Sequence, residues 1–421
     1  MKRLFLISLL FSASILTMFA QQNDDSAAMT DSVATTADDS LYVALLTCDP
    51  GTDAYKLFGH TAIRVQNKNN PEADFSFNYG IFDFRMENFI YRFVIGETDY
   101  WLDAEPMWRF LDRYSEEGIR IYEQELNITS DQKALLAQLL VINAQPENRV
   151  YRYNFLYDNC TTRARDIIQR ALGIRNLKCE AKGLGLTYRD ILHIYTNSSP
   201  WTEFGIDMVL GCEVDRPADV RAGEFIPAVY MHDADSTYII AENGEVKPFV
   251  KNTIVYEPKG QHLLIPDFPL SPVVTFWIVF AFVLLVNVFD CYRKKLSRWV
   301  DVALLSLQGI AGVVVSFLFF FSDHPAVDTN WLVIAFNPLA FVMIPIVLLN
   351  RTKWRKLKMA AECVNMTVLV FLLLLFVLPL QWVNPAVLPL ALSLLIRSII
   401  RMKQTRRTFS CVFFHSVNHR F

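Results

Sequence analysis

The stretch YDNCTTRARD, residues 157–166, begins the helix from which the rest of the sequence can be interpreted. Asp158 and Asn159 are both good N-cap residues, because their side-chain oxygens accept hydrogen bonds from the unpaired amides of a first helical turn. An apolar stripe at helical spacing follows, and Gly173 after it is typical of the position that ends a helix. The stripe consists of Ala164, Ile167, Ile168, Ala171 and Leu172.

Cys160 lies in the first turn of this helix, four residues before Ala164, and therefore faces the core with the apolar stripe. The dipole of the helix places partial positive charge at its N-terminus, which favours a thiolate over a thiol. Such a cysteine is a candidate nucleophile if a histidine can reach it, with its own amide as an oxyanion donor. The alternative is a buried structural cysteine, which is the commoner case when the helix is judged alone.

A predicted strand earlier in the chain supplies a histidine. Residues 60–65 alternate in polarity as a half-buried strand does, and they begin with His60. A lone histidine on a strand is usually structural, so His60 becomes a candidate base only through Cys160. A second alternating strand, rich in aromatic residues, is predicted over residues 74–84. Its polar-tipped residues, any of which can orient an imidazole, are Asn78, Tyr79 and Asp83.

The remaining predicted elements complete an α+β domain. Short apolar or alternating runs predict further strands, and one segment with helical spacing predicts a helix capped by Ser130. The strands are at residues 41–48, 89–95 and 119–126, and the helix is at residues 131–144. Residues 187–267 contain many turn-forming residues, so this segment is interpreted as loop-rich and no chemistry is assigned to it.

The first 40 residues have the composition of an export signal and a linker. Residues 1–20 combine a basic start, an apolar stretch and a small-residue end, which is typical of a cleaved signal peptide; an uncleaved anchor is the alternative. Residues 21–40 are polar and acidic, without an aromatic residue, and are predicted to be a disordered linker. Residues 41–267 are then an exported, periplasmic domain.

The second half of the chain is predicted to be a transmembrane domain of five helices over residues 271–402, followed by a basic tail at 403–421. The loops after the first, third and fifth stretches are basic, whereas the other two contain no lysine or arginine, so the basic loops are predicted to be cytoplasmic. His324, Asp328 and Asn330 fall in a non-cytoplasmic loop, interpreted as a solvated connector, with a lipid headgroup or the exported domain as alternative contacts. The apolar stretches are at about 272–289, 302–321, 331–349, 364–380 and 385–400.

Cysteine count and net charge restrict the partners. The chain has seven cysteines, and if Cys160 stays free, at most one disulfide can form among Cys48, Cys179 and Cys212. No cysteine or histidine spacing suits a metal, and no cofactor is predicted. The formal net charge of -3 gives no reason to expect a nucleic acid partner.

Four motifs together resemble a known family. A histidine strand that precedes a cysteine helix resembles the circularly permuted papain-like proteins of the NlpC/P60 kind, in which an Asn-Cys pair comparable to Asn159-Cys160 starts the helix. More narrowly, the combination is similar to the Lnb N-terminal periplasmic domain, with membrane helices following as in that family. The motifs are LLTC at residues 45–48, FGHTAIRV at 58–65, FNYGIFDF at 77–84 and DNCTTR at 158–163.

The resemblance implies a lipoprotein N-acyltransferase of the inner membrane. Such an enzyme moves an acyl chain from a membrane phospholipid to the α-amine of the diacylglyceryl cysteine of an apolipoprotein. His60 and Cys160 are the positions that carry over as catalytic residues, and Asn78 is chosen as the third member although no position matches uniquely. Two alternatives remain: an anchored NlpC/P60-like peptidoglycan peptidase, for which one span would suffice, and a non-enzymatic membrane scaffold in which Cys160 is core.

Overall fold

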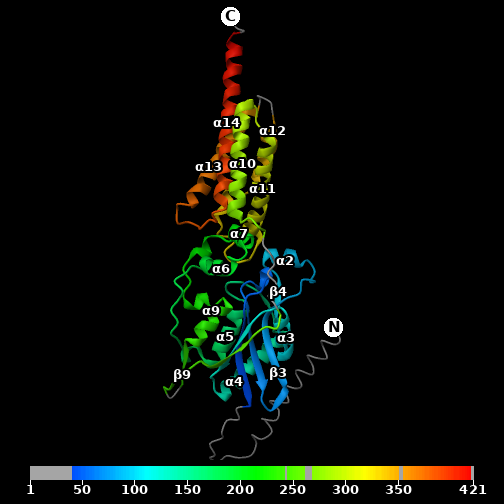
Figure 1. Cartoon of the computed structure of the whole chain (residues 1–421), viewed down its shortest axis with the longest axis vertical. Coiled ribbons are helices and arrows are strands. Elements are labelled where there is room, and N and C mark those ends of the chain that lie inside the picture. The colour runs from blue at the N-terminus through cyan, green and yellow to red at the C-terminus, as the bar shows by residue number, and fades with distance from the viewer. Residues whose placement is uncertain (1–39, 242–243, 261–267, 350–353, 419–421) are drawn as a thin grey trace, which may run out of the picture.

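The computed structural model describes residues 40–241, 244–260, 268–349 and 354–418, without the side chains of residue 54 and of residues 406–418. A sheet-rich domain and a bundle of long helices lie end to end along the long axis of the molecule (Figure 1). The expected signal peptide at residues 1–20, and the expected linker up to residue 39, lie outside the described residues. The α+β class predicted from the sequence is confirmed, and the histidine strand precedes the cysteine helix as a permuted papain-like domain requires.

The central sheet has seven strands in the order β10-β5-β1-β2-β3-β4-β6, all paired antiparallel. The register pairs Cys48 with His60, so the histidine is the first residue of its strand, at one end of the sheet. Four of the predicted strands, those at residues 41–48, 60–65, 74–84 and 119–126, are confirmed. The strands are β1 (Leu41–Cys48), β2 (His60–Asn67), β3 (Asn70–Ile81), β4 (Asp99–Pro106), β5 (Ile121–Leu126), β6 (Val150–Arg152) and β10 (Val250–Tyr256).

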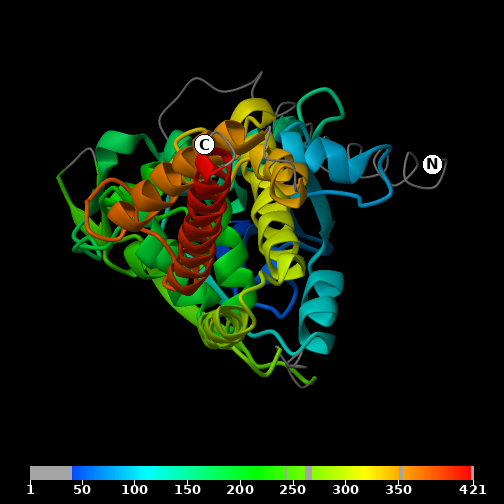
Figure 2. The same ribbon diagram turned by 90° about the horizontal axis from the view of Figure 1, so that it is seen from above.

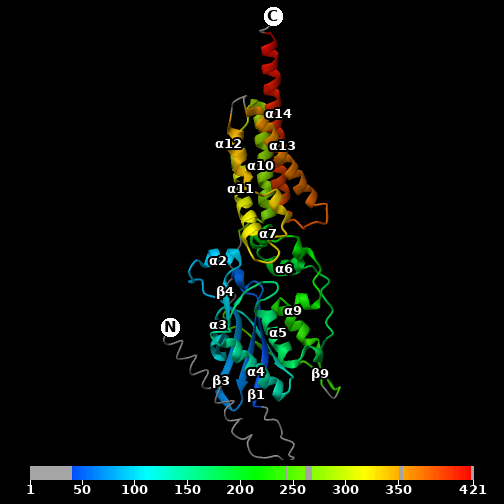
Figure 3. The same ribbon diagram turned by 180° about the vertical axis from the view of Figure 1, so that it is seen from behind.

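Helices cover both faces of this sheet. The side chains of β1 alternate, so Val43 and Leu45 pack in the core beneath α4 (Ser130–Ala144), α5 (Cys160–Leu172) and α9 (Pro227–Asp235). Leu46 and Cys48 point the other way, into a smaller core with α3 (Met107–Glu116). A second sheet, β7 (Leu177–Cys179), β8 (Thr237–Ile240) and β9 (Val246–Pro248), lies at the end far from the bundle (Figure 3).

Helix α5 begins where the sequence predicts. Asn159 is its N-cap, and its Oδ1 accepts hydrogen bonds of 2.9 Å from the amides of Thr161 and Thr162. The Thr162 hydroxyl in return accepts a 2.8 Å bond from the Asn159 amide, which completes a capping box. Asp158 does not cap the helix but forms an ion pair with Arg163. The cap fixes Cys160 as the first residue of the helix.

Three predictions in this domain are wrong. Residues 89–95 form helix α2 (Phe89–Ile95) instead of a strand, because a short run that is apolar except for Arg92 has no clear period to separate the two, and Gly96 at φ +80° ends a helix there. Residues 187–267 are not loop-rich where they are described, since short helices occupy much of residues 188–235 and the strands β8, β9 and β10 follow. Thr129, one residue before Ser130, is the N-cap of α4. The additional elements are α6 (Tyr188–Thr196), α7 (Pro200–Val209), η3 (Cys212–Asp215), α8 (Val220–Gly223), η1 (Ala54–Lys56) and η2 (Ile174–Asn176).

The bundle consists of α10 (Pro272–Arg293), α11 (Arg298–Phe321), η4 (Trp331–Ile334) with α12 (Leu339–Leu348), α13 (Arg355–Leu375) and α14 (Val387–Asn418), seen from above in Figure 2. Within the described residues, four segments are long and apolar enough to cross a membrane: 272–293, 298–321, 331–348 and 355–375. The fifth predicted span, 385–400, falls in α14. Arg397, Arg401 and Lys403 interrupt the apolar run of that helix.

The arginines of α14 are paired inside the bundle. Arg397 contacts Asp290 of α10 and Asp301 of α11 at 2.8 Å each, and Arg401 contacts Asp301 at 2.7 Å and Glu362 of α13 at 2.6 Å. All five side chains are buried. Buried charges persist only when paired, so this network holds α14 against three other helices despite its charges.

The third span is broken at Asn337-Pro338, as its proline predicts. The Asn337 side chain replaces part of the lost helical bonding by donating to Ile334 O at 2.7 Å and accepting from the Leu339 amide at 3.1 Å. Residues 335–338 therefore link η4 to α12 without leaving these backbone groups unpaired.

The loop after α11 docks onto the sheet domain instead of forming a solvated connector. The Gly211 amide donates to Ala326 O at 2.7 Å, and Asn330 Nδ2 donates to Met208 O at 2.9 Å. A Cβ on Gly211 would lie 2.3 Å from the backbone of Thr329, so only glycine allows this close approach. His324 Nε2 lies 2.6 Å from Phe93 O in α2. The two halves of the molecule are thus joined by specific bonds.

Candidate active site

The structure brings His60 and Cys160 together at one end of the central sheet. Helix α5 packs across β2 and β3, and the hydroxyls of Thr61 and Thr161 lie 3.1 Å apart between the two elements. Because each threonine is the next residue after a candidate catalytic residue, this contact fixes the helix start against the strand start. Cys160 is buried, as its place on the apolar face of α5 predicts.

The surroundings of Cys160 favour its thiolate. Burial raises the pKa of this thiol, but the charge of the neighbouring His60, a hydrogen bond from its ring, and hydrogen bonds from the Thr61 amide and the Thr161 hydroxyl lower it. The lowering effects are together the larger, so the pKa of Cys160 lies below that of an ordinary thiol. Cys48, on the neighbouring strand, has the opposite balance, because burial raises the pKa of its thiol well above the ordinary value.

Asn78 holds the second nitrogen of the imidazole. Its Oδ1 lies 3.4 Å from His60 Nε2, and its Nδ2 is 3.3 Å from Glu105 Oε1 and 3.2 Å from Ser76 Oγ. The nitrogen of the Asn78 side chain already donates, so this side chain offers its oxygen to the histidine. An oxygen accepts only from a protonated nitrogen, so the proton of His60 belongs on Nε2, and Nδ1 of the ring is left for the thiol of Cys160. Arg113 pairs with Glu105 at 2.6 Å and thereby fixes the acceptor of the Asn78 amide.

Tyr114 of α3 fixes the plane of the histidine ring. The two rings are stacked with centroids 6.3 Å apart and an angle of 15° between their planes. Burial raises the pKa of the Tyr114 phenol well above its usual value, so the ring against His60 stays neutral. The imidazole is therefore held at its Nε2 edge by Asn78 and over one face by Tyr114.

Two hydrogen-bond donors near the thiol are unused. Asn159 Oδ1 takes the amides of Thr161 and Thr162, and within the described residues no acceptor lies in reach of the Cys160 amide. The hydroxyl of Tyr151 is buried and likewise has no hydrogen-bond partner in the described part of the chain. Either group can donate to an oxyanion formed beside Cys160.

Gly80 allows the strand β3 to pass close to the thiol. Its φ is +87°, and a Cβ there would lie 3.5 Å from Cys160 Cβ and 3.3 Å from the ring of Tyr153. Any larger residue would be strained at this φ and would narrow the space in front of the thiol. Gly80 therefore belongs to the site, although the sequence pattern pointed to Asn78 in the same strand and not to Gly80.

A cavity of about 970 Å³ starts at His60 and Cys160 and extends to the membrane helices. This volume is at the upper end of the range of roughly 300–1,000 Å³ for ligand pockets. Its walls are mostly apolar and come from both halves of the chain. The sheet domain contributes Phe58, Phe82, Tyr100, Tyr153 and Phe155, and α11 contributes Val313, Val314, Phe317 and Leu318.

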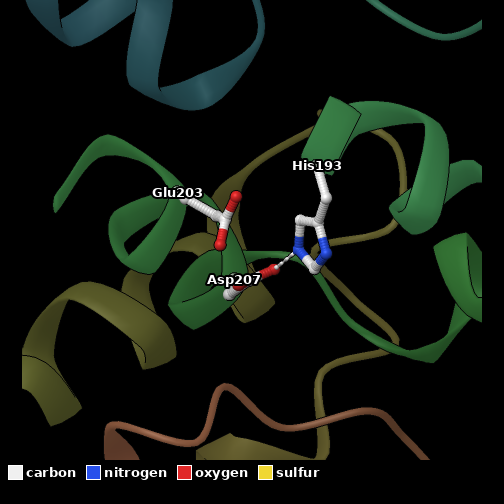
Figure 4. A group of neighbouring side chains, drawn as sticks. All are labelled: His193, Glu203 and Asp207. Atoms are coloured by element: carbon white, nitrogen blue, oxygen red, sulfur yellow. Dashed lines mark hydrogen bonds and ion pairs between the residues drawn. The ribbon is translucent and has the colours of Figure 1, made fainter. Parts of the chain in front are cut away.

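A second histidine site lies between α6 and α7, where His193, Glu203 and Asp207 place ligand-type atoms within 4.8 Å of one another (Figure 4). Asp207 Oδ1 already accepts from His193 Nε2 at 2.9 Å and from Arg189 Nη1 at 2.8 Å, and its Oδ2 accepts from Asn384 Nδ2 at 2.8 Å. The guanidinium of Arg189 beside Asp207 repels a cation, and both oxygens of Asp207 already accept hydrogen bonds. This cluster, which sequence reasoning missed, ties α6 and α7 to the loop before α14.

The described cysteines are all free thiols. These are Cys48, Cys160, Cys179, Cys212, Cys291 and Cys363. A Cys179–Cys212 disulfide, left open by the sequence, is therefore not formed. Four residues that shape the site were missed because their sequence context is ordinary: Glu105, Tyr114, Tyr151 and Thr161. Of these, only Thr161 had an available signal, its position next to Cys160.

The fold and the site together define an α+β domain followed by a bundle of apolar helices, with a thiol at a helix N-terminus and a histidine on an adjacent strand. A family model described as the Lnb N-terminal periplasmic domain matches residues 30–194, and one described as the Lnb transmembrane domain matches residues 265–408. The chain therefore belongs to the Lnb family, which indicates a membrane-bound acyltransferase with a periplasmic domain. Comparison with curated proteins and with solved structures gave no match.

Proposed function

We propose that this protein is a lipoprotein N-acyltransferase of the inner membrane that uses Cys160 as nucleophile and His60 as base. The observation that carries the proposal is the apolar cavity that joins the Cys160 thiol to the lipid-facing helix α11. An acyl chain is the substrate group whose chemistry suits such walls, because its methylenes gain free energy by leaving water. A soluble peptide substrate would suit these walls less well, because most of the lining is apolar.

In the first half-reaction the Cys160 thiolate attacks an ester carbonyl of a membrane phospholipid. A carbon–sulfur bond forms and the ester carbon–oxygen bond breaks, which leaves a thioester on Cys160. The imidazolium of His60 gives its proton to the departing glycerol oxygen, and lysophospholipid leaves. The Cys160 amide and the Tyr151 hydroxyl are the unused donors for the oxyanion of this step.

In the second half-reaction the α-amine of the diacylglyceryl cysteine of an apolipoprotein attacks the thioester. The carbon–nitrogen bond forms, the carbon–sulfur bond breaks, and His60 takes the proton that the amine loses. Cys160 returns to its thiolate beside the protonated imidazole, so no cofactor is consumed. Asn78 acts as a positioning residue, since its oxygen keeps the histidine proton on Nε2 and leaves Nδ1 facing the reaction.

The proposed topology places the sheet domain in the periplasm. The start of α10 lies at the sheet domain, and so does the start of the third span, where Asn330 bonds to Met208 O, whereas the basic loop after α10 lies at the far end of the bundle (Figure 1). The positive-inside rule then makes the far end cytoplasmic.

Reporter fusions after Lys358 and after Arg407 should report cytoplasm, and a fusion at Asp328 should report periplasm. A periplasmic report after Arg407 would contradict the fifth span.

The experiment that tests the function is mass spectrometry of lipoprotein N-terminal peptides. Cells that lack the protein and any redundant activity should carry lipoproteins with a free α-amine on the diacylglyceryl cysteine. Supplying the wild-type chain should add one amide-linked acyl chain, and the variant Cys160→Ala should not, whereas Cys179→Ala, which removes an exposed thiol, should. If the N-termini stay unchanged but peptidoglycan stems are cut, the protein is a peptidase. If neither changes, it is a scaffold.

A further inference from the structure

Helix α2 presents apolar side chains to solvent at the end of the sheet domain that faces the bundle. The exposed fractions are 77% for Ile90, 61% for Tyr91 and 45% for Phe93. Figures 1 and 3 show α2 beside the foot of the bundle, displaced to one side of it. Large apolar side chains gain free energy when they leave water, yet no other part of the described chain buries these three.

The position of α2 is fixed relative to the end of a membrane span. Three residues that directly follow α11 bond to the last carbonyls of α2: the Ser322 hydroxyl to Val94 O at 2.8 Å, the Asp323 amide to Ile95 O at 2.9 Å, and His324 Nε2 to Phe93 O at 2.6 Å. Phe320 and Phe321, the last residues of α11, are themselves largely exposed. The apolar face of α2 therefore lies at the level where α11 leaves the bilayer.

The same two helices form the rim of the cavity. Phe93 and Val94 line it from α2, and Val313, Val314 and Phe317 line it from α11. Val313 and Val314 are also about half exposed. The wall that α2 and α11 form is therefore the part of the cavity lining that belongs to a candidate membrane span and to the apolar helix beside it.

We propose that α2 is an interfacial helix whose Ile90, Tyr91 and Phe93 lie in the phospholipid leaflet next to the sheet domain, where they flank a lateral entrance to the cavity. Aromatic and aliphatic side chains on a helix in the plane of the interface are typical of such anchors. Continuity with α11 identifies the occupant as lipid. Three side chains fall short of the ~800 Å² that each partner of a stable protein interface buries, which argues against a second protein.

The lipid contact of α2 rests on geometry, and its role as an entrance rests on the proposed function. The direct test is a photo-crosslinker, p-benzoylphenylalanine, in place of Tyr91 in the full chain embedded in phospholipid nanodiscs. The matched control carries it in place of Ile142, which is 45% exposed on α4, a helix that Figure 1 draws in the part of the sheet domain away from the bundle. Irradiation should add the mass of one phospholipid at position 91 and nothing at position 142.

Absence of the lipid adduct at position 91, or an adduct with a second copy of the chain, would overturn the proposal. The crosslink forms without enzyme turnover, so it tests the lipid contact of α2 separately from the acyltransferase activity. A lipid adduct at position 91 in a protein that transfers no acyl chain would refute only the acyltransferase proposal. For the entrance, I90E/Y91E should raise the apparent KM for vesicle phospholipid about tenfold with kcat retained, since charge weakens interfacial binding. I142E should leave KM unchanged; an unchanged KM in I90E/Y91E would overturn the entrance.

Discussion

The two histidine sites of this protein contain similar groups and differ in what they leave unused. At the first site, Cys160 has a lowered pKa, its amide has no acceptor among the described residues, and a large apolar cavity begins at its sulfur. At the second, the buried Asp207 has both oxygens occupied by Arg189, His193 and Asn384. Neither Asp207 nor His193 lines the cavity that begins at Cys160.

The difference separates chemistry from architecture. A reactive site must hold its groups rigidly yet keep one nucleophile and some donors free for a substrate that arrives later. A structural cluster minimises its free energy by satisfying every group at once, because an unpaired buried polar atom is costly. A perturbed histidine with a carboxylate partner is therefore weaker evidence of catalysis than an under-satisfied thiol beside a cavity.

The largest expected effect is on the first site. Cys160→Ala should reduce N-acyl transfer to background, because no other described thiol adjoins His60 and the cavity, while the protein still inserts and melts close to the wild-type temperature. The measurements are lipoprotein N-terminal mass spectrometry and thermal unfolding in detergent. Cys179→Ala is the control and should retain activity. Full activity of Cys160→Ala would mean that Cys160, like the residues of the second site, has a structural role and no catalytic one.

His60→Ala should lower activity by roughly 10²–10⁴-fold, the usual value of a general base. It should also slow alkylation of Cys160 by iodoacetamide near neutral pH, because the charge and the hydrogen bond of His60, which lower the pKa of the thiol against the effect of burial, are then lost. His193→Ala is the matched control from the second site and should leave alkylation unchanged. Equal labelling rates in all three proteins would show that His60 does not act on the thiol.

Asp207→Ala should act on stability instead of chemistry. It removes the fully buried partner of the Arg189 guanidinium, which is 3% exposed and keeps Asp215 at 2.6 Å, so the cost should approach but not exceed the ~3–5 kcal/mol of breaking a buried pair. Glu180→Ala, which breaks the exposed pair with Lys178, is the control and should cost about 0–1 kcal/mol. Both values can be measured by denaturant unfolding, and a loss for Asp207→Ala as small as that of the control would mean that the cluster does not hold α7 in place.

The smallest expected effect is a pH dependence of the second site. Burial lowers the pKa of His193, but the hydrogen bond to Asp207 and the charge of that carboxylate raise it by more. The pKa of His193 in the folded protein therefore lies above the ordinary value of 6.5. A raised pKa means that the stabilisation is fully present below about pH 6.5 and is lost as pH rises through the folded-state value. The unfolding temperature of His193→Gln should therefore fall below that of the wild type at acidic pH and converge with it at alkaline pH. Parallel curves would contradict this sign.

Local signals in the sequence were enough to place the two candidate site residues, Cys160 and His60, on their elements. The Asn159 cap, the stripe behind Cys160 and the alternation after His60 are properties of short segments, and the helix and strand form where these predict. Helix α2 was predicted wrongly because a seven-residue apolar run has no distinguishing period, and contacts with the distant loop after α11 determine its position. Local pattern fails where tertiary contacts choose between two allowed structures.

The surroundings of the site depend on contacts that no local pattern records. Glu105 reaches Asn78 across 27 residues, and the cavity wall from Val313 belongs to a different domain from Cys160. The Asp207 cluster joins α7 to Asn384 over 177 residues. Such groups carry no motif of their own, so only the fold identifies them.

The most direct test is to give purified protein a phospholipid with a labelled acyl chain and no acceptor. Ping-pong chemistry requires the enzyme to accumulate a thioester, with lysophospholipid released before any amine is present. The labelled acyl group should be found on a peptide containing Cys160, should be removed by neutral hydroxylamine, and should be absent from Cys160→Ala. Label transferred to lipoprotein by a protein that never carries it on Cys160 would contradict the thiol mechanism.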